Sequence, residues 1–259
     1  MLHWRERFQN AARVKIKTAV RELHPRQTFR IARANRDAVS NVFVKIEADD
    51  ICGFGEASPN SFYGESAEVV LEKLASATPQ IESLAVSDVA SLERAWTELW
   101  PLLAPSRAAQ CAIDVALWDW LAKRRGISVA ELAWAEPPRP VPTFCTIGIS
   151  DPAELEQKLA ELSGFPFIKI KSDSRADLAT LRLVRERSAA VLAVDANGAW
   201  SAADLAAHSA ELARLGVRFI EQPLAPGCDA QLRRGECGVP VFADESCAVE
   251  EHIPRIATR

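Results

Sequence analysis

The sequence predicts an α/β protein, with a small N-terminal α+β domain over residues 1–137 and an incomplete (β/α) TIM-type barrel over residues 138–259. Three observations predict this architecture. In the first half, strand-like segments precede helix-like segments, an order typical of α+β domains. In the second half, strands and helices alternate at a regular step, which is typical of a parallel sheet covered by helices. Between the halves, four prolines within residues 137–142 form a stiff connector.

Local patterns predict the elements of the first half. Segments with β-branched and aromatic residues are expected to be strands: Val14–Val20, Val39–Glu47 and Ile51–Glu56, the last interrupted by glycines. Helices are expected at Ser66–Ala77, Asp88–Trp100 and Ser106–Arg125. The last of these begins at a serine that can cap it and stops at Gly126, a typical helix end.

The second half repeats a strand and a helix. Apolar strands are expected at Val141–Ile149, Phe167–Lys171, Val191–Asp195, Val217–Glu221 and Pro240–Asp244, and they start 26, 24, 26 and 23 residues apart. Helices are expected at Asp151–Gly164, Arg175–Arg187 and Ser201–Leu215. No glycine-rich phosphate loop follows the first strand, so a nucleotide-binding sheet is less favoured than a barrel. A barrel would carry its active site at the carboxyl ends of the strands.

Only about five of the eight βα units of a barrel are predicted. Three more units would need roughly 75 further residues, given the ~250 residues of a typical barrel. A partial barrel has two open edges, and open edges favour aggregation. The chain is therefore expected to be a fragment of a longer protein.

Composition excludes several classes of function. A net charge of −4 without a basic stretch argues against nucleic acid as a partner. No apolar run approaches the ~20 residues that span a membrane, and the charged N-terminus lacks the apolar core of a signal peptide. The six cysteines lie far apart with no CxxC pair, so they are expected to be reduced and not to bind zinc. A soluble, cytoplasmic protein is expected.

Two lysines share one face of a predicted strand. Because side chains alternate along a strand, Lys169 and Lys171 point to one side and the isoleucines between them to the other. Inside a barrel, mutual repulsion and burial would lower the pKa of these lysines, which would let one of them act as a base. The pattern alone equally allows an edge strand with solvated lysines.

Three carboxylates end three successive predicted strands. Asp195, Glu221 and Asp244 are separated by 26 and 23 residues, one βα step each, so they are expected at the same rim. A single acid there could simply cap the next helix. Three acids in register repel one another unless a cation neutralises them. Oxygen ligands without His or Cys favour Mg²⁺ over zinc.

A lysine beside a Mg²⁺ site suggests proton abstraction. A divalent ion that binds a substrate carboxylate stabilises the enediolate formed when the adjacent carbon loses its proton. Such a combination of a Lys or His base with Mg²⁺ is known in enolase-type sites. The motifs KIK (169–171), VDANGAW (194–200), EQPL (221–224) and ADES (243–246) resemble the muconate-lactonising subgroup of the enolase superfamily, and within it the dipeptide epimerases of the L-Ala-D/L-Glu type. Further stretches extend the likeness to nearly the whole chain from about residue 13: FRIARANR (29–36), GFGEASPNSFYGES (53–66), CAIDVALWDWLAKRRG (111–126) and TIGI (146–149).

The resemblance implies a capping domain over a modified TIM barrel and a dipeptide substrate, with an expected role in recycling peptidoglycan peptides. It implies that Lys171 is the base, that Lys169 supports it, and that the three carboxylates bind magnesium. Asn197 and Glu245 would lie behind the metal ligands. The resemblance places Arg33 or Arg36 in a loop over the substrate and Thr146 at the dipeptide, although each could equally be an ordinary surface or strand residue. Family members often form even-numbered assemblies, which allows a homo-oligomer, but no interface signal stands out.

Alternatives stay open at this point. An o-succinylbenzoate synthase, a muconate cycloisomerase or an N-succinylamino acid racemase would share the same half of the site. Epimerisation needs a base on each face of the α-carbon, and the family places the second lysine on the strand after the DES motif. No lysine follows Lys171 in this sequence. A catalytically incomplete fragment is therefore the other reading.

Overall fold

The computed structural model describes residues 12–25, 29–31, 34–36, 38–134, 138–173, 178–233 and 235–257. Contacts divide the chain into two compact units. Unit 1 comprises Met1–His24 and Ala38–Pro140, and unit 2 comprises Pro25–Asp37 and Val141–Arg259. The assignment of Pro25–Asp37 to unit 2 has no counterpart in the sequence prediction.

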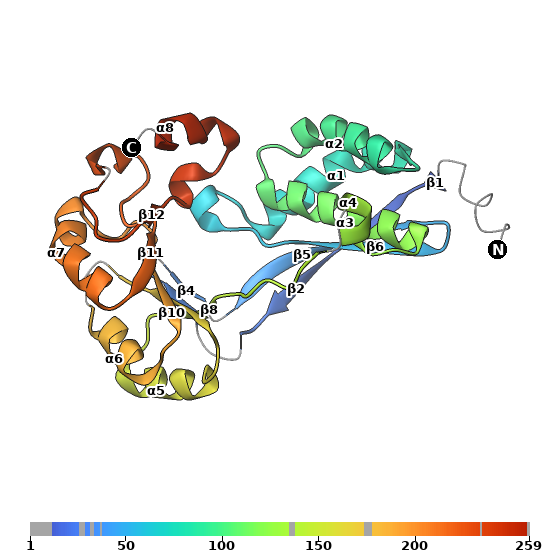
Figure 1. Cartoon of the computed structure of the whole chain (residues 1–259). Coiled ribbons are helices and arrows are strands. Elements are labelled where there is room, and N and C mark those ends of the chain that lie inside the picture. The colour runs from blue at the N-terminus through green and yellow to red at the C-terminus, as the bar shows by residue number, and fades with distance from the viewer. Residues whose placement is uncertain are drawn as a thin grey trace. The chain divides into compact units, whose positions relative to one another are not determined.

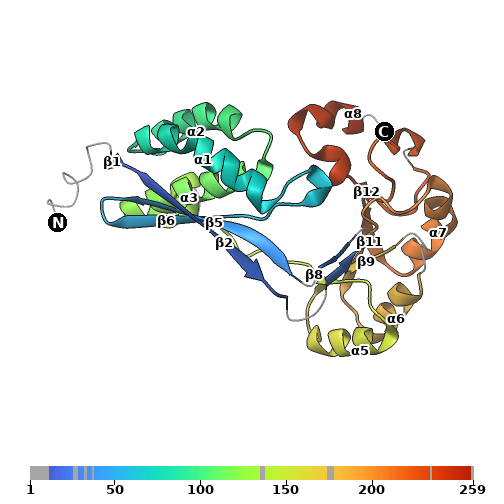
Figure 2. The same ribbon diagram turned by 180° about the vertical axis from the view of Figure 1, so that it is seen from behind.

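Unit 1 is a three-stranded antiparallel sheet with helices on one face (Figures 1 and 2). The strand order is β2-β5-β6, with β2 at Lys15–Leu23, β5 at Val39–Ala48 and β6 at Ile51–Ala57. The helices are α1 (Ala67–Ser83), α2 (Val89–Leu103), α3 (Arg107–Arg125) and the short α4 (Val129–Ala133). A two-stranded pair, β1 (Ala12–Arg13) with β7 (Ala85–Val86), completes the described part of the unit. The predicted order of strands followed by helices is confirmed.

Side-chain caps explain where these helices start. Ser66, Asp88 and Ser106 each accept a hydrogen bond from the backbone N–H three residues ahead. Helix α1 continues to Ser83, beyond its predicted end at Ala77 and through Pro79. The buried face of this helix continues to Ile81, so packing outweighs the backbone hydrogen bond that proline cannot donate.

The glycines of β6 have a packing function. A Cβ on Gly53 would lie 2.1 Å from the carbonyl oxygen of Ala116, and one on Gly55 would lie 1.9 Å from that of Ala112. Both carbonyls belong to α3. The GFG stretch therefore lets the strand and the helix backbone pack in direct contact.

Unit 2 is a five-stranded parallel sheet in the order β12-β11-β10-β9-β8. The strands are β8 (Cys145–Ile147), β9 (Phe167–Lys171), β10 (Val191–Asp195), β11 (Val217–Glu221) and β12 (Val241–Phe242). The three middle strands match their predicted bounds, whereas β8 and β12 at the two edges are shorter than predicted. Each edge strand has only one neighbouring strand in this sheet, which leaves fewer ladder bonds to define its ends.

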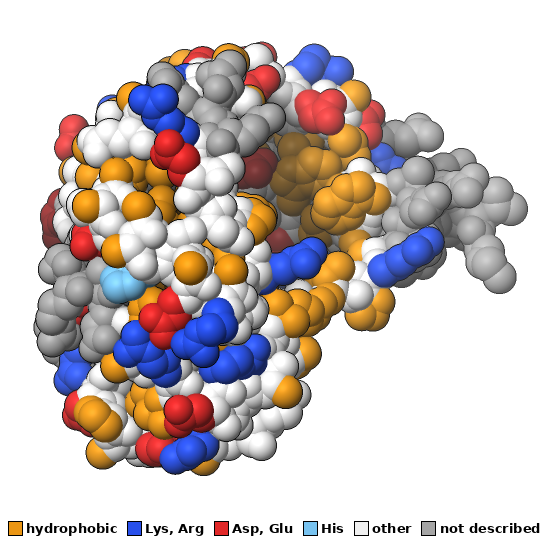
Figure 3. Space-filling view, turned by 60° about the vertical axis from the view of Figure 1, so that its left-hand side comes forward, with side chains coloured by type: hydrophobic (Ala, Val, Ile, Leu, Met, Phe, Trp, Pro, Cys, Tyr) orange, Lys and Arg blue, Asp and Glu red, His pale blue; other side chains and the backbone are white. Residues whose placement is uncertain are grey.

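Helices α5 (Pro152–Glu161), α6 (Ala179–Arg187) and α7 (Ala202–Arg214) cover one face of this sheet (Figure 1). The core of unit 2 lies between these helices and the sheet, and it contains Ile168, Ile170, Leu192 and Ile220. Their solvent face mixes acidic and basic side chains (Figure 3), including the ion pair between Arg182 of α6 and Glu211 of α7. None of the helices in the described residues is long and apolar enough to cross a membrane.

Short elements complete unit 2. They are the hairpin of β3 (Phe29–Ile31) and β4 (Ala34–Arg36), the 3₁₀ turns η2 (Asp229–Gln231), η3 (Glu245–Cys247) and η4 (Glu250–His252), and α8 (Ile253–Ala257). The hairpin is joined to the rest of the unit by a hydrogen bond from the Ile149 N–H to the Arg30 carbonyl (3.0 Å). Arg30 also forms an ion pair with Glu154 of α5 at 3.1 Å.

Candidate active site

The register of the sheet brings the predicted site residues together. Lys171 of β9, Asp195 of β10 and Glu221 of β11 are direct neighbours across the strands. Because neighbours in register point to the same side of a sheet, all three side chains lie on the face away from the helix-packed isoleucines. The strand ends therefore place one lysine and two carboxylates in a row.

Both lysines contact carboxylates. The Lys169 ammonium lies 3.0 Å from Glu221 Oε2 and 3.3 Å from Asp195 Oδ2. Lys171 Nζ donates hydrogen bonds to Asp195 Oδ2 and, at 3.0 Å, to Asn197 Oδ1. Asp195 is completely buried. A buried carboxylate needs paired partners, and here the two ammonium groups supply them.

The electrostatics of Lys169 differ from the sequence prediction. Burial lowers the pKa of Lys169, but its hydrogen bond to Glu221 and the charges of Asp195 and Glu221 raise it more, so the pKa lies above its ordinary value. The predicted lowering of this pKa is wrong for the chain without a bound cation. The prediction considered repulsion between the lysines and overlooked the attraction of the acids on the next two strands.

The acids also influence one another. Burial and then the charge of Asp195 raise the pKa of Glu221, and the Lys169 ammonium offsets part of this rise. Partial burial, then the charges of Glu245 and Asp195, raise the pKa of Asp244. Burial first, and the neighbouring acids second, thus disfavour the charged forms of these carboxyl groups. A cation bound among them would offset both effects.

Asn197 and Glu245 lie behind these residues. The Asn197 backbone N–H donates to Asp195 Oδ1 (3.0 Å), and its side-chain amide donates to Glu245 Oε1 (3.2 Å). Asn197 has a φ of 45°, a left-handed conformation that asparagine tolerates better than most residues. Both residues are buried. They orient Asp195 and Lys171 from behind.

Sequence reasoning missed the role of Gln222. Its side-chain oxygen accepts hydrogen bonds from the backbone N–H groups of Asp244 (2.9 Å) and Ser246 (3.0 Å), while its amide donates to the Leu224 carbonyl. Gln222 is almost fully buried and has a φ of 38°. Residues held in such sparsely populated conformations cluster at functional sites. Its place directly after Glu221 in the EQPL motif was the available signal.

A layer of aromatic rings was also missed. Phe219 and Phe242 stack at 4.3 Å with 7° between their planes, and Phe144 lies between Phe167 and Phe219 at 5.2 and 5.7 Å. Phe167 and Phe219 each stand two residues before a site residue on the same strand face. Phe167 and Phe219 therefore line the same strand face as the charged row, and Phe242 lies in register with Glu221 beside it.

The remaining predicted residues have mixed outcomes. Thr146 of β8 is exposed and in register with Lys169, so it borders the row. Arg36 belongs to β4, but its side chain lies outside the described residues, as does the whole of Arg33. In unit 1, Glu65 accepts hydrogen bonds from the Ser106 hydroxyl and the Ala108 N–H at the start of α3, so it has a role in holding that helix.

The carboxylate oxygens of Asp195, Glu221 and Asp244 are donors of the type that binds a hard divalent ion. No group of three or more His, Cys, Asp or Glu side chains in the described ranges already has the spacing of a metal site. Asp195 and Glu221 do converge on one positive group, the Lys169 ammonium. Asp195, Glu221 and Asp244 would be the residues to hold a divalent ion, since carboxylate oxygens are its preferred ligands.

Comparison with known proteins identifies the family. Residues 12–133 match the N-terminal domain of mandelate racemase and muconate lactonizing enzyme, and residues 152–258 match the enolase C-terminal-like domain. An L-Ala-D/L-Glu epimerase from Escherichia coli is 37% identical over 236 residues, which cover 89% of this chain and 70% of that protein. The chain belongs to the enolase superfamily.

Solved members of the enolase superfamily have the same fold. An enolase family member from Agrobacterium tumefaciens, solved with sodium and L-Ala-L-Glu, is 31% identical, with a TM-score of 0.85 over 95% of this chain and 73% of that one. A dipeptide epimerase from Methylococcus capsulatus, solved with Mg and L-Arg-D-Lys, is 27% identical, with a TM-score of 0.81 over 96% of this chain and 72% of that one. The predicted family and fold class are thus confirmed.

Proposed function

We propose that this chain carries the metal site and one catalytic base of a Mg²⁺-dependent dipeptide epimerase of the L-Ala-D/L-Glu type. The observation that carries the proposal is the register of Lys171, Asp195 and Glu221 at the ends of three adjacent strands. The likeness to the Escherichia coli epimerase supports the dipeptide as substrate class. The KIK, VDANGAW and EQPL motifs contain the three residues that the sheet brings into register, which supports the proposal.

The metal would be held by Asp195, Glu221 and Asp244. When bound, Mg²⁺ supplies the positive charge that stabilises an enediolate at the substrate carboxylate. Lys171 stands beside Asp195, and its amine in the neutral form takes the proton from the α-carbon of the C-terminal residue. Asn197 and Asp195 hold the Lys171 amine at the strand end. Lys169, one residue pair deeper, adds positive charge beside Glu221.

The face from which the proton returns decides whether the α-proton is only exchanged or the α-carbon is inverted. Lys171 reaches one face of the α-carbon, and a proton returned from that face restores the original configuration. Inversion needs a proton donor on the opposite face, and no lysine follows Lys171 in these 259 residues. The chain is therefore expected to exchange the α-proton with solvent without inverting the centre.

The test is α-proton exchange of L-Ala-L-Glu by the 259-residue chain with Mg²⁺ in D₂O, followed by the NMR signal of the glutamate α-proton. Slow loss of this signal is expected, with retention of the L,L configuration. Lys171→Ala should abolish exchange because it removes the base, whereas Lys15→Ala, at an exposed position of β2 in unit 1, should not change it. Equal exchange by Lys171→Ala would contradict the assignment of the base, and measurable epimerisation would contradict the two-base argument.

A further inference from the structure

The segment that carries Asp244 has little regular structure of its own. Asp244 follows the two-residue strand β12 and precedes the 3₁₀ turn η3, and its own side chain caps neither. Asp195 and Glu221, by contrast, end strands of five residues with hydrogen-bonded neighbours on both sides. Something other than the sheet ladder must position Asp244 relative to the other two acids.

Gln222 supplies this positioning. It is the residue directly after Glu221, and its side-chain oxygen accepts both the Asp244 and the Ser246 N–H. Its backbone N–H also donates to the Phe242 carbonyl at 2.8 Å. The Gln222 side chain thus links the end of β11, where Glu221 lies, to the backbone of Asp244. A buried amide with both ends bonded has a single orientation, so it transmits position accurately.

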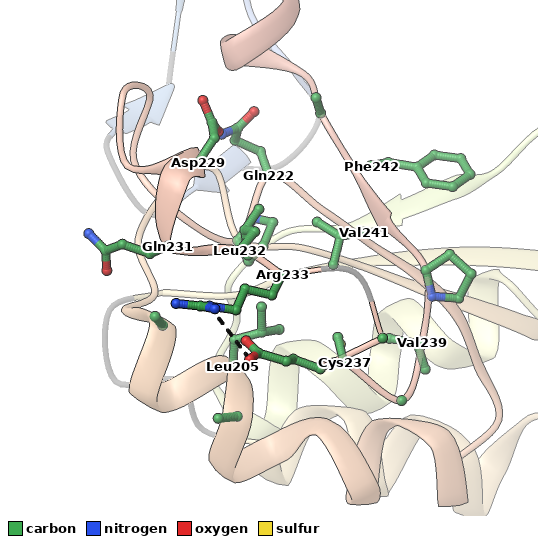
Figure 4. A pocket seen from close by; sticks show the side chains of 18 of the residues that line it. Leu205, Gln222, Asp229, Gln231, Leu232, Arg233, Cys237, Val239, Val241 and Phe242 are labelled. Carbon is green, nitrogen blue, oxygen red and sulfur yellow. Dashed lines mark ion pairs between the residues drawn. The ribbon is translucent and has the colours of Figure 1, made fainter. Parts of the chain in front are cut away.

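Three further residues fix the other side of this turn. The Gln222 amide donates to Ser246 Oγ (2.8 Å), and this hydroxyl donates to Asp229 Oδ1 (2.7 Å). Arg255 of α8 donates to Asp229 Oδ2 (2.6 Å) and to the Ser246 carbonyl (3.0 Å). Gln222, Ser246 and Asp229 are all buried. Figure 4 shows the polar ends of Gln222 and Asp229 turned toward each other at one end of a cavity of about 550 Å³.

We propose that Gln222, Ser246, Asp229 and Arg255 form a clamp that fixes the Asp244 turn against the end of β11, and that this clamp sets the affinity of the metal site. The second half of this inference rests on the proposed function, because it takes Asp244 as a ligand. Gln222 is a positioning residue, since it contacts the backbone of Asp244 and no reacting atom. Groups that orient metal ligands from behind change metal affinity by about 10–100-fold when they are removed.

The experiment measures the turn and the metal separately on the full 259-residue chain. Amide hydrogen exchange by NMR reports the turn, and Mn²⁺ titration followed by electron paramagnetic resonance reports the metal site. Gln222→Met keeps the size of the side chain and removes its four hydrogen bonds. Exchange of the Asp244 and Ser246 amides should become roughly tenfold faster or more, while amides of β10 stay unchanged. The Mn²⁺ dissociation constant should rise about 10–100-fold.

Gln157→Met is the matched control, because Gln157 is exposed on α5 and, within the described residues, its side chain donates to Glu161 of the same helix. It should change neither measurement. Unchanged exchange at Asp244 and Ser246 in Gln222→Met would overturn the clamp. If this variant does not fold, Arg255→Met decides, since the Arg255 side chain is about half exposed. Faster exchange of the Ser246 amide then supports the clamp, and wild-type exchange overturns it.

The two proposals fail in different ways. If the wild-type chain binds no Mn²⁺, the metal site of the proposed function fails, and the exchange measurement still decides whether Gln222 holds the turn. If the wild-type chain binds Mn²⁺ and Gln222→Met binds it equally tightly, the proposed function stands and the claim that the clamp sets the affinity is overturned.

Discussion

The two units use buried charge differently. In unit 1, the buried Arg124 donates to the Val86 carbonyl and pairs at 3.1 Å with Asp49, whose side chain is 40% exposed. In unit 2, Lys169, Asp195 and Glu221 bond chiefly to one another. Charges that satisfy a backbone stabilise a fold, whereas charges that oppose each other in a buried row contribute little to stability. This difference agrees with the proposed role of the row in unit 2 as a metal site.

The strongest way to break this comparison is Asp195→Asn. Loss of one charge at about 4 Å from a cation removes about 4 kcal/mol at an effective dielectric constant of 20, which corresponds to roughly a 1000-fold weaker Mn²⁺ affinity. Calorimetric titration measures this change. Asp50→Asn, in the exposed turn between β5 and β6, is the control and should leave the affinity unchanged. Wild-type affinity in Asp195→Asn would show that the row does not bind the metal.

Gly55→Ala in unit 1 is expected to lower the stability of the fold without changing the metal affinity. The new Cβ would lie 1.9 Å from the Ala112 carbonyl oxygen, so strand and helix must separate, at a cost of about 3 kcal/mol. Urea unfolding followed by tryptophan fluorescence measures the loss, since Trp120 is buried on the same helix, next to Gly53 of β6.

Gly227→Ala in unit 2 is the control. No atom lies within 4 Å of its added Cβ, so only the strain of its left-handed backbone remains, about 1 kcal/mol.

Metal affinity should be unchanged in Gly55→Ala. A large loss of affinity there would mean that the two units do not have separate roles.

The smallest effect is expected for a surface pair of unit 2. The hydrogen bonds from Arg182 lower the pKa of Glu211 to about 2. A lowered carboxylate pKa stabilises the fold above the ordinary pKa of 4.5, and this contribution is lost as the pH falls toward 2. Glu211→Gln should therefore be slightly less stable than the wild type at pH 7, and the gap should close between pH 4.5 and 2.

Thermal unfolding across this pH range measures the gap. Glu161→Gln on α5 is the control, because within the described residues Glu161 accepts a hydrogen bond from Gln157 and forms no ion pair. High salt should reduce the Glu211 effect, since the pair lies at the surface. A gap that widens on acidification would contradict the sign of the pKa shift.

The sequence predicted those parts of the fold that depend on periodicity. The strand β9 and its alternation follow directly from Phe-Ile-Lys-Ile-Lys, and the spacing of Asp195 and Glu221 follows from the βα step. The ends of β8 and β12 could not be predicted, because an edge strand lacks a second neighbour. The extension of α1 to Ser83 follows the helical spacing of the buried Leu74, Ala77 and Ile81, which continues past Pro79 and beyond the predicted end.

The sequence predicted the composition of the candidate site and two of its supporting residues, Asn197 and Glu245, but not the support from Gln222. Three acids and two lysines were visible because each ends or lines a strand. The bonds of Gln222 depend on contacts with Asp244 and Ser246, 22 and 24 residues away, so the EQPL motif could mark Gln222 but not explain it. The raised pKa of Lys169 needed the positions of acids on two other strands.

The position of the Lys169 ammonium between Asp195 and Glu221 has a consequence for the metal-free protein. An internal cation already balances two of the three acids, so the strand ends do not need an ion to stay together during folding. If the proposed site takes up Mg²⁺, the ion adds to or replaces the positive charge that Lys169 already places beside these two acids. Removal of the ion by a chelator is expected to leave a folded chain that takes up metal again without passing through an unfolded state.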